Sequence, residues 1–297
     1  MPLQQLVEYF NDRLEQEHSN GFRPFTLQDS TVKAQFGPIR LASTLLPIRQ
    51  TLATATISGH IAQLEIATAH HQPLQDSELP YLLHDQPNTD NGNTAAIINF
   101  DRLSRTVHML NYLPLTHLGD ILFLDVDPRH ILGIKEDHGA YFEEIIVKCG
   151  LQTQHVAIGL TLEQVHARFF PAFLKGLHNY QRRGYRLALK FNGYALEKPV
   201  FELIEKIAPD FVGISAQGLE QIQDASTFGK IQQLNSLTAS IEARSLLLHV
   251  EDKFQAELAR KAGFNLVQGD YFEQAITSVN RPDTRLSSAS RMSNAHW

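Results

Sequence analysis

The fold is decided by two runs near the carboxyl end, LLLHVED at residues 246–252 and GFNLVQGDYF at residues 263–272. Each run begins as an apolar strand and ends in polar groups. The residues between the two runs have the pattern of a helix. The stretch is therefore strand, helix, strand, with polar side chains at both strand ends. In parallel α/β sheets, functional groups gather at those strand ends.

The same alternation extends through the preceding sequence. Helices are expected over 137–150, 162–182, 197–207, 218–235 and 252–262, and apolar strands over 121–126, 155–160, 185–190, 211–215, 245–250 and 265–268. Alternating strands and helices predict a parallel sheet. With the β-like residues at 38–67, the strands suffice for an α/β fold, a TIM-like (β/α)8 barrel. A doubly wound open sheet is the alternative, but its GxGxxG or GxxxxGK[ST] phosphate loops are absent.

Composition places few limits on function. The chain has 297 residues and a net charge of −6, with 43% hydrophobic and 20% charged residues. The charge predicts no general attraction to nucleic acid or to anionic membranes. Neither a signal peptide nor an apolar run of about 18 residues is seen, so we expect no membrane span. The single Cys149 excludes an internal disulfide and fits a reducing cytoplasm.

Several motifs together resemble the EAL domain, the barrel that hydrolyses the bacterial messenger cyclic di-GMP. The stretch at 246–272 is similar to the family's AEGVE, a helix, and GxxxxQGYxF. An earlier run, GHIAQLEIA at 59–67, fits the family's GxIxGxEAL. Weaker counterparts of the NxS, ExTE, DDFG and KxD strand ends are DVDP at 125–128, GLTL at 159–162, KFNG at 190–193 and GIS at 213–215.

The resemblance implies roles for ten positions, some matching and some changed. Those that match or nearly match the family are Glu65 and Asp125 at metal-binding positions, with Glu251 and Gln268 near the end. Those that replace a family side chain are Gly159 for a metal-binding Glu, Lys190 for an Asp, Gly213 for the Lys tied to the attacking water, and Leu248 for a Glu. Phe191 also replaces an Asp, and Ala69 stands where an Arg is expected.

These replacements predict that no catalytic residue, metal or cofactor remains and that the protein is not an enzyme. A cation pair would be under-coordinated, and Lys190 would repel it. The resemblance then implies a degenerate, stand-alone EAL barrel at 21–276. An N-terminal helix at 1–20 precedes it and a flexible polar tail at 277–297 follows. It would act by protein–protein interaction in bacterial motility, biofilm or transcription control, on an unidentified partner. A homodimer stays open.

Two other functions remain as alternatives. The first is a receptor that binds cyclic di-GMP without cutting it, through Glu65, Asp125, Glu251 and Gln268; the changes at 69 and 190 disfavour it. The second is an active phosphodiesterase. The basic cluster of Tyr180, Arg182, Arg183 and Arg186 favours a helix end over a phosphate site. A loop at 72–95 and arginines at 281, 285 and 291 are further candidate surfaces.

Overall fold

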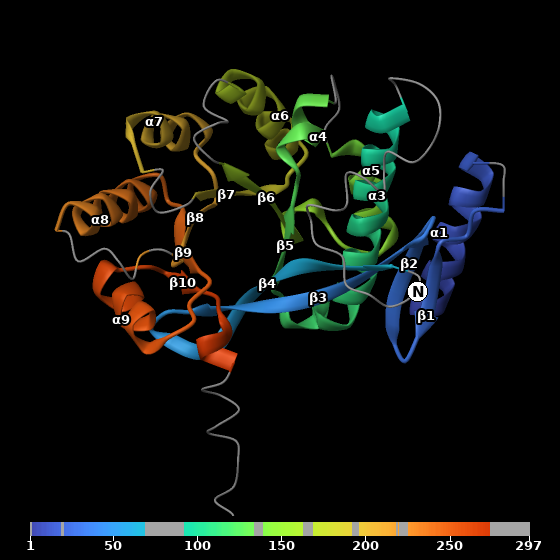
Figure 1. Ribbon diagram of the computed structural model, residues 1–297, viewed down its shortest axis with the longest axis horizontal. Coiled ribbons are helices and arrows are strands. Elements are labelled where there is room, and N and C mark those ends of the chain that lie inside the picture. The colour runs from blue at the N-terminus through green and yellow to red at the C-terminus, as the bar shows by residue number, and fades with distance from the viewer. Residues whose placement is uncertain are drawn as a thin grey trace, which may run out of the picture.

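Eight strands close into a barrel, as expected from the sequence (Figure 1). The computed structural model describes residues 2–18, 21–68, 92–133, 139–162, 169–191, 196–217, 219 and 225–273. Around the barrel the order is β3-β10-β9-β8-β7-β6-β5-β4, and β4 pairs back with β3. The strands are β3 (Ile39–Gln50), β4 (Ala53–Thr68), β5 (Ile121–Asp125), β6 (Val156–Leu162), β7 (Arg186–Phe191), β8 (Phe211–Ser215), β9 (Arg244–Leu248) and β10 (Leu266–Val267).

Strand β3 runs against its two barrel neighbours. It pairs antiparallel with β4 and with β10, whereas the other printed barrel pairings are parallel. Only Thr51 and Leu52 separate β3 from β4, and a two-residue connection can only reverse the chain direction. The short β-like runs expected at 38–67 are therefore one long hairpin, which departs from a uniformly parallel sheet.

Helices cover the outside of the barrel (Figure 1). They are α3 (Gly92–Tyr112), α4 (Pro128–Gly133), α5 (Ala140–Lys148), α6 (Phe170–Arg182), α7 (Lys198–Ile207), α8 (Ala225–Ser240) and α9 (Lys253–Ala262), with the 3-10 turns η1 (Leu113–Leu118) and η2 (Thr153–His155). Helix α9 shows why the ends fall where they do. Asp252 accepts a hydrogen bond from the Gln255 N–H, and Gly263 ends the helix in the left-handed region at φ 80°.

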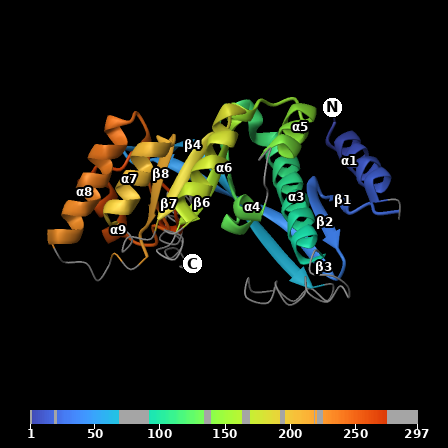
Figure 2. The ribbon, with the colours of Figure 1, turned by 90° about the horizontal axis from the view of Figure 1, so that it is seen from above.

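An N-terminal layer extends the sheet beyond the barrel (Figure 2). Strands β1 (Phe25–Gln28) and β2 (Thr31–Phe36) continue antiparallel from β3, and α1 (Leu3–His18) packs on them. Two asparagines fasten this layer. The Asn11 amide bonds the backbone N–H and C=O of Phe25, and the Asn111 amide from α3 does the same for Val32.

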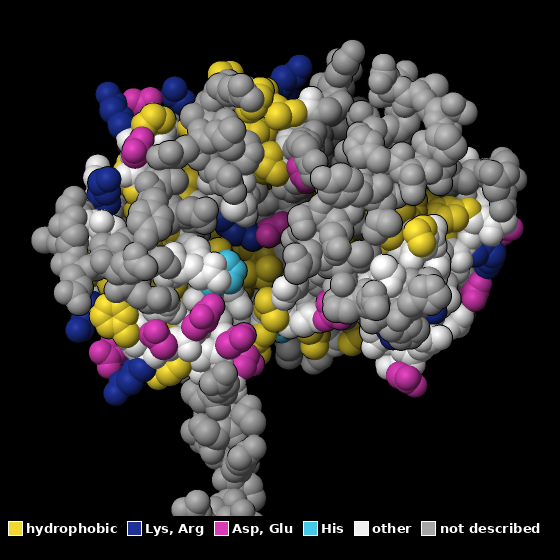
Figure 3. Space-filling view, in the orientation of Figure 1, with side chains coloured by type: hydrophobic (Ala, Val, Ile, Leu, Met, Phe, Trp, Pro, Cys, Tyr) yellow, Lys and Arg dark blue, Asp and Glu magenta, His cyan; other side chains and the backbone are white. Residues whose placement is uncertain are grey.

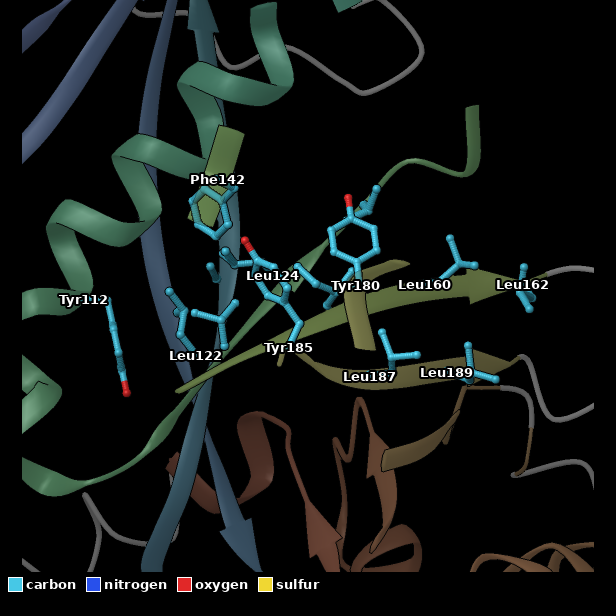
Figure 4. Close-up of a cluster of buried hydrophobic side chains, with 14 of the residues drawn as sticks. Tyr112, Leu122, Leu124, Phe142, Leu160, Leu162, Tyr180, Tyr185, Leu187 and Leu189 are labelled. Atoms are coloured by element: carbon cyan, nitrogen blue, oxygen red, sulfur yellow. The ribbon is translucent and has the colours of Figure 1, made fainter. Parts of the chain in front are cut away.

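The barrel strands β5 to β10 bury both of their faces, whereas β3 and β4 are only partly buried. Residues such as Phe123, Phe211 and Leu246 point inward and fill the barrel, and their neighbours along each strand point outward. Figure 4 shows the outward set, in which leucines of β5, β6 and β7 pack against aromatic side chains of the surrounding segments. Inward-facing residues near the carboxyl ends of the strands then line the opening of the barrel.

Several expected segments differ from the structure. Strand β6 runs to Leu162 and α6 begins at Phe170, so the helix expected from 162 begins later. The predicted loop at 72–95 lies outside the described residues except for 92–95, which begin α3. Residues 274–297, with the arginines of the predicted tail, also lie outside them.

Candidate functional site

Six polar side chains at the carboxyl ends of the inner strands form the candidate site, here called the barrel mouth: Asp125, Lys190, Ser215, His249, Glu251 and Gln268. They come from three strands, β5, β7 and β8, and from the segments that follow β9 and β10. The centre of the face in Figure 3 shows basic, acidic and histidine side chains beside hydrophobic ones. The barrel interior beneath them is filled by the hydrophobic cluster that includes Leu246 and Leu248.

An ion pair between Lys190 and Asp125 lies at the barrel mouth and crosses over β6. The Lys190 ammonium donates to both carboxylate oxygens of Asp125, with Nζ 2.6 Å from Oδ2. The Lys190 side chain is 8% exposed and that of Asp125 is 49% exposed. The cation is thus nearly out of water while its partner faces solvent. A buried ammonium requires such a partner, because an unpaired charge in this position is costly.

Two glycines make room for Lys190. Strand register places Gly159 of β6 beside Asp125, and Gly213 of β8 beside Lys190. A Cβ built at Gly159 would overlap Asp125 Oδ1 and would lie 3.0 Å from Lys190 Cε, while one built at Gly213 would lie 3.4 Å from Lys190 Cγ. The side chains absent at these positions leave the channel that Lys190 occupies.

A second polar pair joins Ser215 and His249. Ser215 Oγ lies 3.0 Å from His249 Nδ1 and accepts a hydrogen bond from the Gln217 N–H at 3.2 Å. Burial lowers the pKa of His249, and Lys190 lowers it further, against the opposing effect of Glu251, Asp125 and Asp270. A neutral imidazole whose Nδ1 accepts the Ser215 proton fits this environment.

The backbone of His249 is unusual for a residue with a side chain. Its φ is 56°, in the left-handed region that favours glycine. By the resemblance, this position is the glycine of AEGVE. His249 was not among the predicted site residues. A histidine at the position of the family's glycine could have marked this residue in the sequence. Its relevance to the site follows only from the structure, which places it beside Ser215.

The remaining predicted residues have separate surroundings. Gln268 is buried, and its Oε1 accepts from the His249 N–H at 3.4 Å. Glu251 receives a 3.5 Å contact from Gln217 Nε2. Leu248 belongs to the barrel interior. Among the described residues, Thr44 on β3 is the side-chain hydrogen-bond partner of Glu65, so Glu65 is bonded into the β3–β4 hairpin.

The residues of the barrel mouth do not fit a pair of divalent cations. Carboxylate and carbonyl oxygens are the ligands that such cations prefer. Gly159 and Leu248 offer no side-chain oxygen, and Phe191 faces the outer core. The Asp125 carboxylate already binds the Lys190 ammonium, whose positive charge would repel a metal ion.

The predicted basic cluster disperses in the structure. Tyr180 is buried next to Arg105, Arg183 pairs with Glu143, and Arg186 donates to the Gln154 carbonyl oxygen. Arg182 lies with Lys175, His178 and Gln181 along a surface groove on α6. These groups do not converge on one point, and they lie outside the barrel mouth.

Comparison with known proteins supports the barrel. The family model described as "EAL domain" matches residues 103–275. Among solved structures, the calcium/cy-diGMP complex of Klebsiella pneumoniae BlrP1 has a TM-score of 0.62 at 16% identity, covering 77% of this chain and 54% of that chain. The chain thus spans about half the length of BlrP1. No curated protein sequence matches this chain.

Two further structures share the fold. The c-di-GMP complex titled PaMucR phosphodiesterase has a TM-score of 0.61 at 13% identity, covering 77% of this chain and 93% of that one. The FimX EAL domain from Pseudomonas aeruginosa bound to c-di-GMP has 0.58 at 11%, covering 78% and 88%. None of the helices in the described part of this chain combines the length and apolar character needed to cross a membrane.

The prediction that this protein is not an enzyme is contradicted by these comparisons. That prediction was drawn from replaced residues alone. The family model that matches residues 103–275 is described as "EAL domain", and the solved structures that share the fold include an "EAL enzyme", Bd1971, and the PaMucR phosphodiesterase. Changed side chains at individual positions therefore do not place the chain outside a family of enzymes.

Proposed function

This chain belongs to the EAL domain family, and from that membership we propose that it binds cyclic di-GMP at the barrel mouth. The solved structures of BlrP1, PaMucR and FimX are complexes with this dinucleotide. Their sequence identity to this chain is low. The shared fold therefore supports the location of the binding site, and the identity of the ligand is what we propose. The protein would then work in cyclic di-GMP signalling.

The observation that carries the proposal is the convergence of polar groups on an otherwise apolar barrel. Lys190 with Asp125 and Ser215 with His249 meet above an interior of leucine and phenylalanine. Hydrogen-bonding groups over an apolar floor suit a ligand that has both phosphates and flat bases. The carboxyl end of a barrel is also where ligands of this fold bind.

Calorimetric titration of the full chain with cyclic di-GMP tests the proposal. We expect saturable binding at one site per chain, and chromatography of the same samples reports whether linear dinucleotide forms. A variant with Ser215→Val and His249→Ala should bind more weakly than one changed at the exposed Gln232 and Gln233 of α8. Absence of any binding by the unaltered chain would refute the proposal.

Regulation through a protein partner is the second candidate function. It is favoured by the layer of α1, β1 and β2, which precedes the matched residues 103–275. Tyr9 on α1 is 37% exposed and Val147 on α5 is 62% exposed, and the Lys148 ammonium stacks over the Tyr9 ring at 3.8 Å. A partner captured by the full chain but lost with Tyr9→Glu and Val147→Glu would support this role, whereas equal capture would oppose it.

A further inference from the structure

The ammonium of Lys190 lies where a ligand of the barrel mouth can reach it. Lys190 points inward from the end of β7, between Gly159 on one side and Gly213 on the other. An ammonium has three N–H donors, and Asp125 takes two of them. No other described residue is hydrogen-bonded to Lys190 Nζ in this arrangement.

The environment strengthens any further bond that Lys190 makes. Its side chain is almost excluded from water, and electrostatic interactions are stronger there than at the surface. The Asp125 carboxylate is half exposed, so it can turn toward solvent when an anion approaches. Burial and Lys190 both lower the pKa of His249 and so favour its neutral form, which leaves Lys190 as the cation among the described residues of the barrel mouth.

In the described part of the opening, the other charges that act on His249 are negative. Glu251 and Asp270 lie close enough to oppose the lowering of the His249 pKa. An incoming dianion would be repelled by these carboxylates and by Asp125. Among the described residues, Lys190 supplies the positive charge at the barrel mouth, so binding of the dianion would depend strongly on it.

Taking the proposed function as its basis, we infer that Lys190 binds a phosphate of cyclic di-GMP directly, so that binding requires no divalent cation. The channel left by Gly159 and Gly213 places a fixed ammonium at the strand ends. A divalent cation does not fit the residues there. The chemical class recognised by this ammonium is a phosphodiester anion, which accepts its third N–H as Asp125 accepts the other two.

Titration with cyclic di-GMP in EDTA, and separately in magnesium, manganese or calcium, tests the inference. We expect equal affinities in all four buffers. Lys190→Met should weaken binding by about tenfold or more, the size expected for loss of one charge-assisted hydrogen bond. The matched control is Lys175→Met on α6, an exposed lysine of the outer surface, which should leave the affinity unchanged.

Asp125→Asn gives a test with the opposite sign. The amide keeps the shape of Asp125 but removes the charge that competes for Lys190, so binding should become severalfold tighter. A purely structural ion pair would instead weaken binding in both variants. Circular dichroism verifies folding, and if Lys190→Met does not fold, Asp125→Asn and the metal series still decide.

The outcomes separate this inference from the proposed function. Binding that appears only with a divalent cation, or that Lys190→Met leaves intact, overturns the inference while the proposed function stands. Binding that is weakened by Asp125→Asn overturns it as well. No binding by the unaltered chain in any buffer overturns both.

Discussion

Lys190 on β7 reaches Asp125 on β5 across the whole width of β6, the strand that lies between them. The contact is made possible by Gly159, the β6 residue in register with Asp125. The absence of a side chain at Gly159 thus allows Lys190 to contact Asp125 at the barrel mouth. The free energy of unfolding of a Gly159 variant measures how strongly the contact depends on this glycine.

Replacing Gly159 by alanine should destabilise the protein by about 1–3 kcal/mol, because the added Cβ would overlap Asp125 and press on Lys190. The control is Gly229→Ala in α8, where an added Cβ meets nothing within 4 Å. That change should stabilise the helix by about 0.5–1 kcal/mol. Urea unfolding followed by circular dichroism measures both changes. Equal changes in the free energy of unfolding at the two positions would show that an added Cβ at Gly159 does not crowd Asp125 and Lys190.

Removing Asp101 should be among the most damaging single changes on α3. Arg105 is 6% exposed, and its guanidinium contacts the Asp101 carboxylate at 2.7 Å. Asp101→Ala would leave a buried cation without this partner, at a cost of about 3–5 kcal/mol. Glu202→Ala, which breaks the exposed pair with Lys198, should cost no more than about 0.5 kcal/mol. Thermal unfolding of both variants measures the difference between the two losses of stability. The two losses would be similar if water reached the Arg105 guanidinium.

His108 should make stability fall in mild acid. Burial lowers its pKa to about 4 in the folded protein, and its Nδ1 lies 2.7 Å from Ser43 Oγ. The unfolded chain binds the proton near pH 6.5, so the free energy of unfolding decreases as the pH falls from about 6.5 to about 4. The loss attributable to this residue is roughly 3 kcal/mol at most.

The measurement for His108 is a difference between two proteins. Urea unfolding at several pH values in this window should give a steeper fall for the unaltered chain than for His108→Gln. His178→Gln, at an exposed position on α6, should retain the full slope. Parallel slopes for all three proteins would mean that His108 is protonated equally in both states.

At His249, glycine should be tolerated better than alanine. Both changes remove the bond to Ser215, but alanine retains the unfavourable left-handed φ of 56° and glycine adopts it readily. His249→Gly should therefore be more stable than His249→Ala by about 1 kcal/mol. At Gln233, inside α8, the order of the two substitutions should reverse. Chemical unfolding of the four variants measures their stabilities. If glycine were more stable than alanine at both positions, or less stable at both, the backbone of His249 would not be strained.

The strands that the sequence predicted well are those buried on both faces. Residues 121–126, 185–190 and 211–215 are mainly apolar runs with a polar residue at or next to the end, and they coincide to within one residue with β5, β7 and β8. This pattern follows from burial alone, so it can be read without tertiary information. The confirmed barrel and the EAL family follow from it and from the motifs around residues 246–272.

The N-terminal half was harder to predict because its elements depend on distant partners. Strands β1 and β2 are half exposed and are held by hydrogen bonds from Asn11 on α1 and Asn111 on α3.

The Lys190–Asp125 pair joins residues 65 positions apart, through a gap that only strand register creates. The sequence indicated the unusual residue types, but which side chains would touch depended on the closed barrel.

The antiparallel β3 also controls when the barrel can form. Gln50 and Arg49 pair with Leu266 and Val267, and Arg49 is bonded to Glu273, 224 positions along the chain. During synthesis the β3–β4 hairpin and the helical layers can assemble early, but the ring stays open until β10 is made. Such distant pairing slows folding and prolongs exposure of apolar surface. The gap between β3 and β9 is then the place where a nascent chain would aggregate or meet a chaperone.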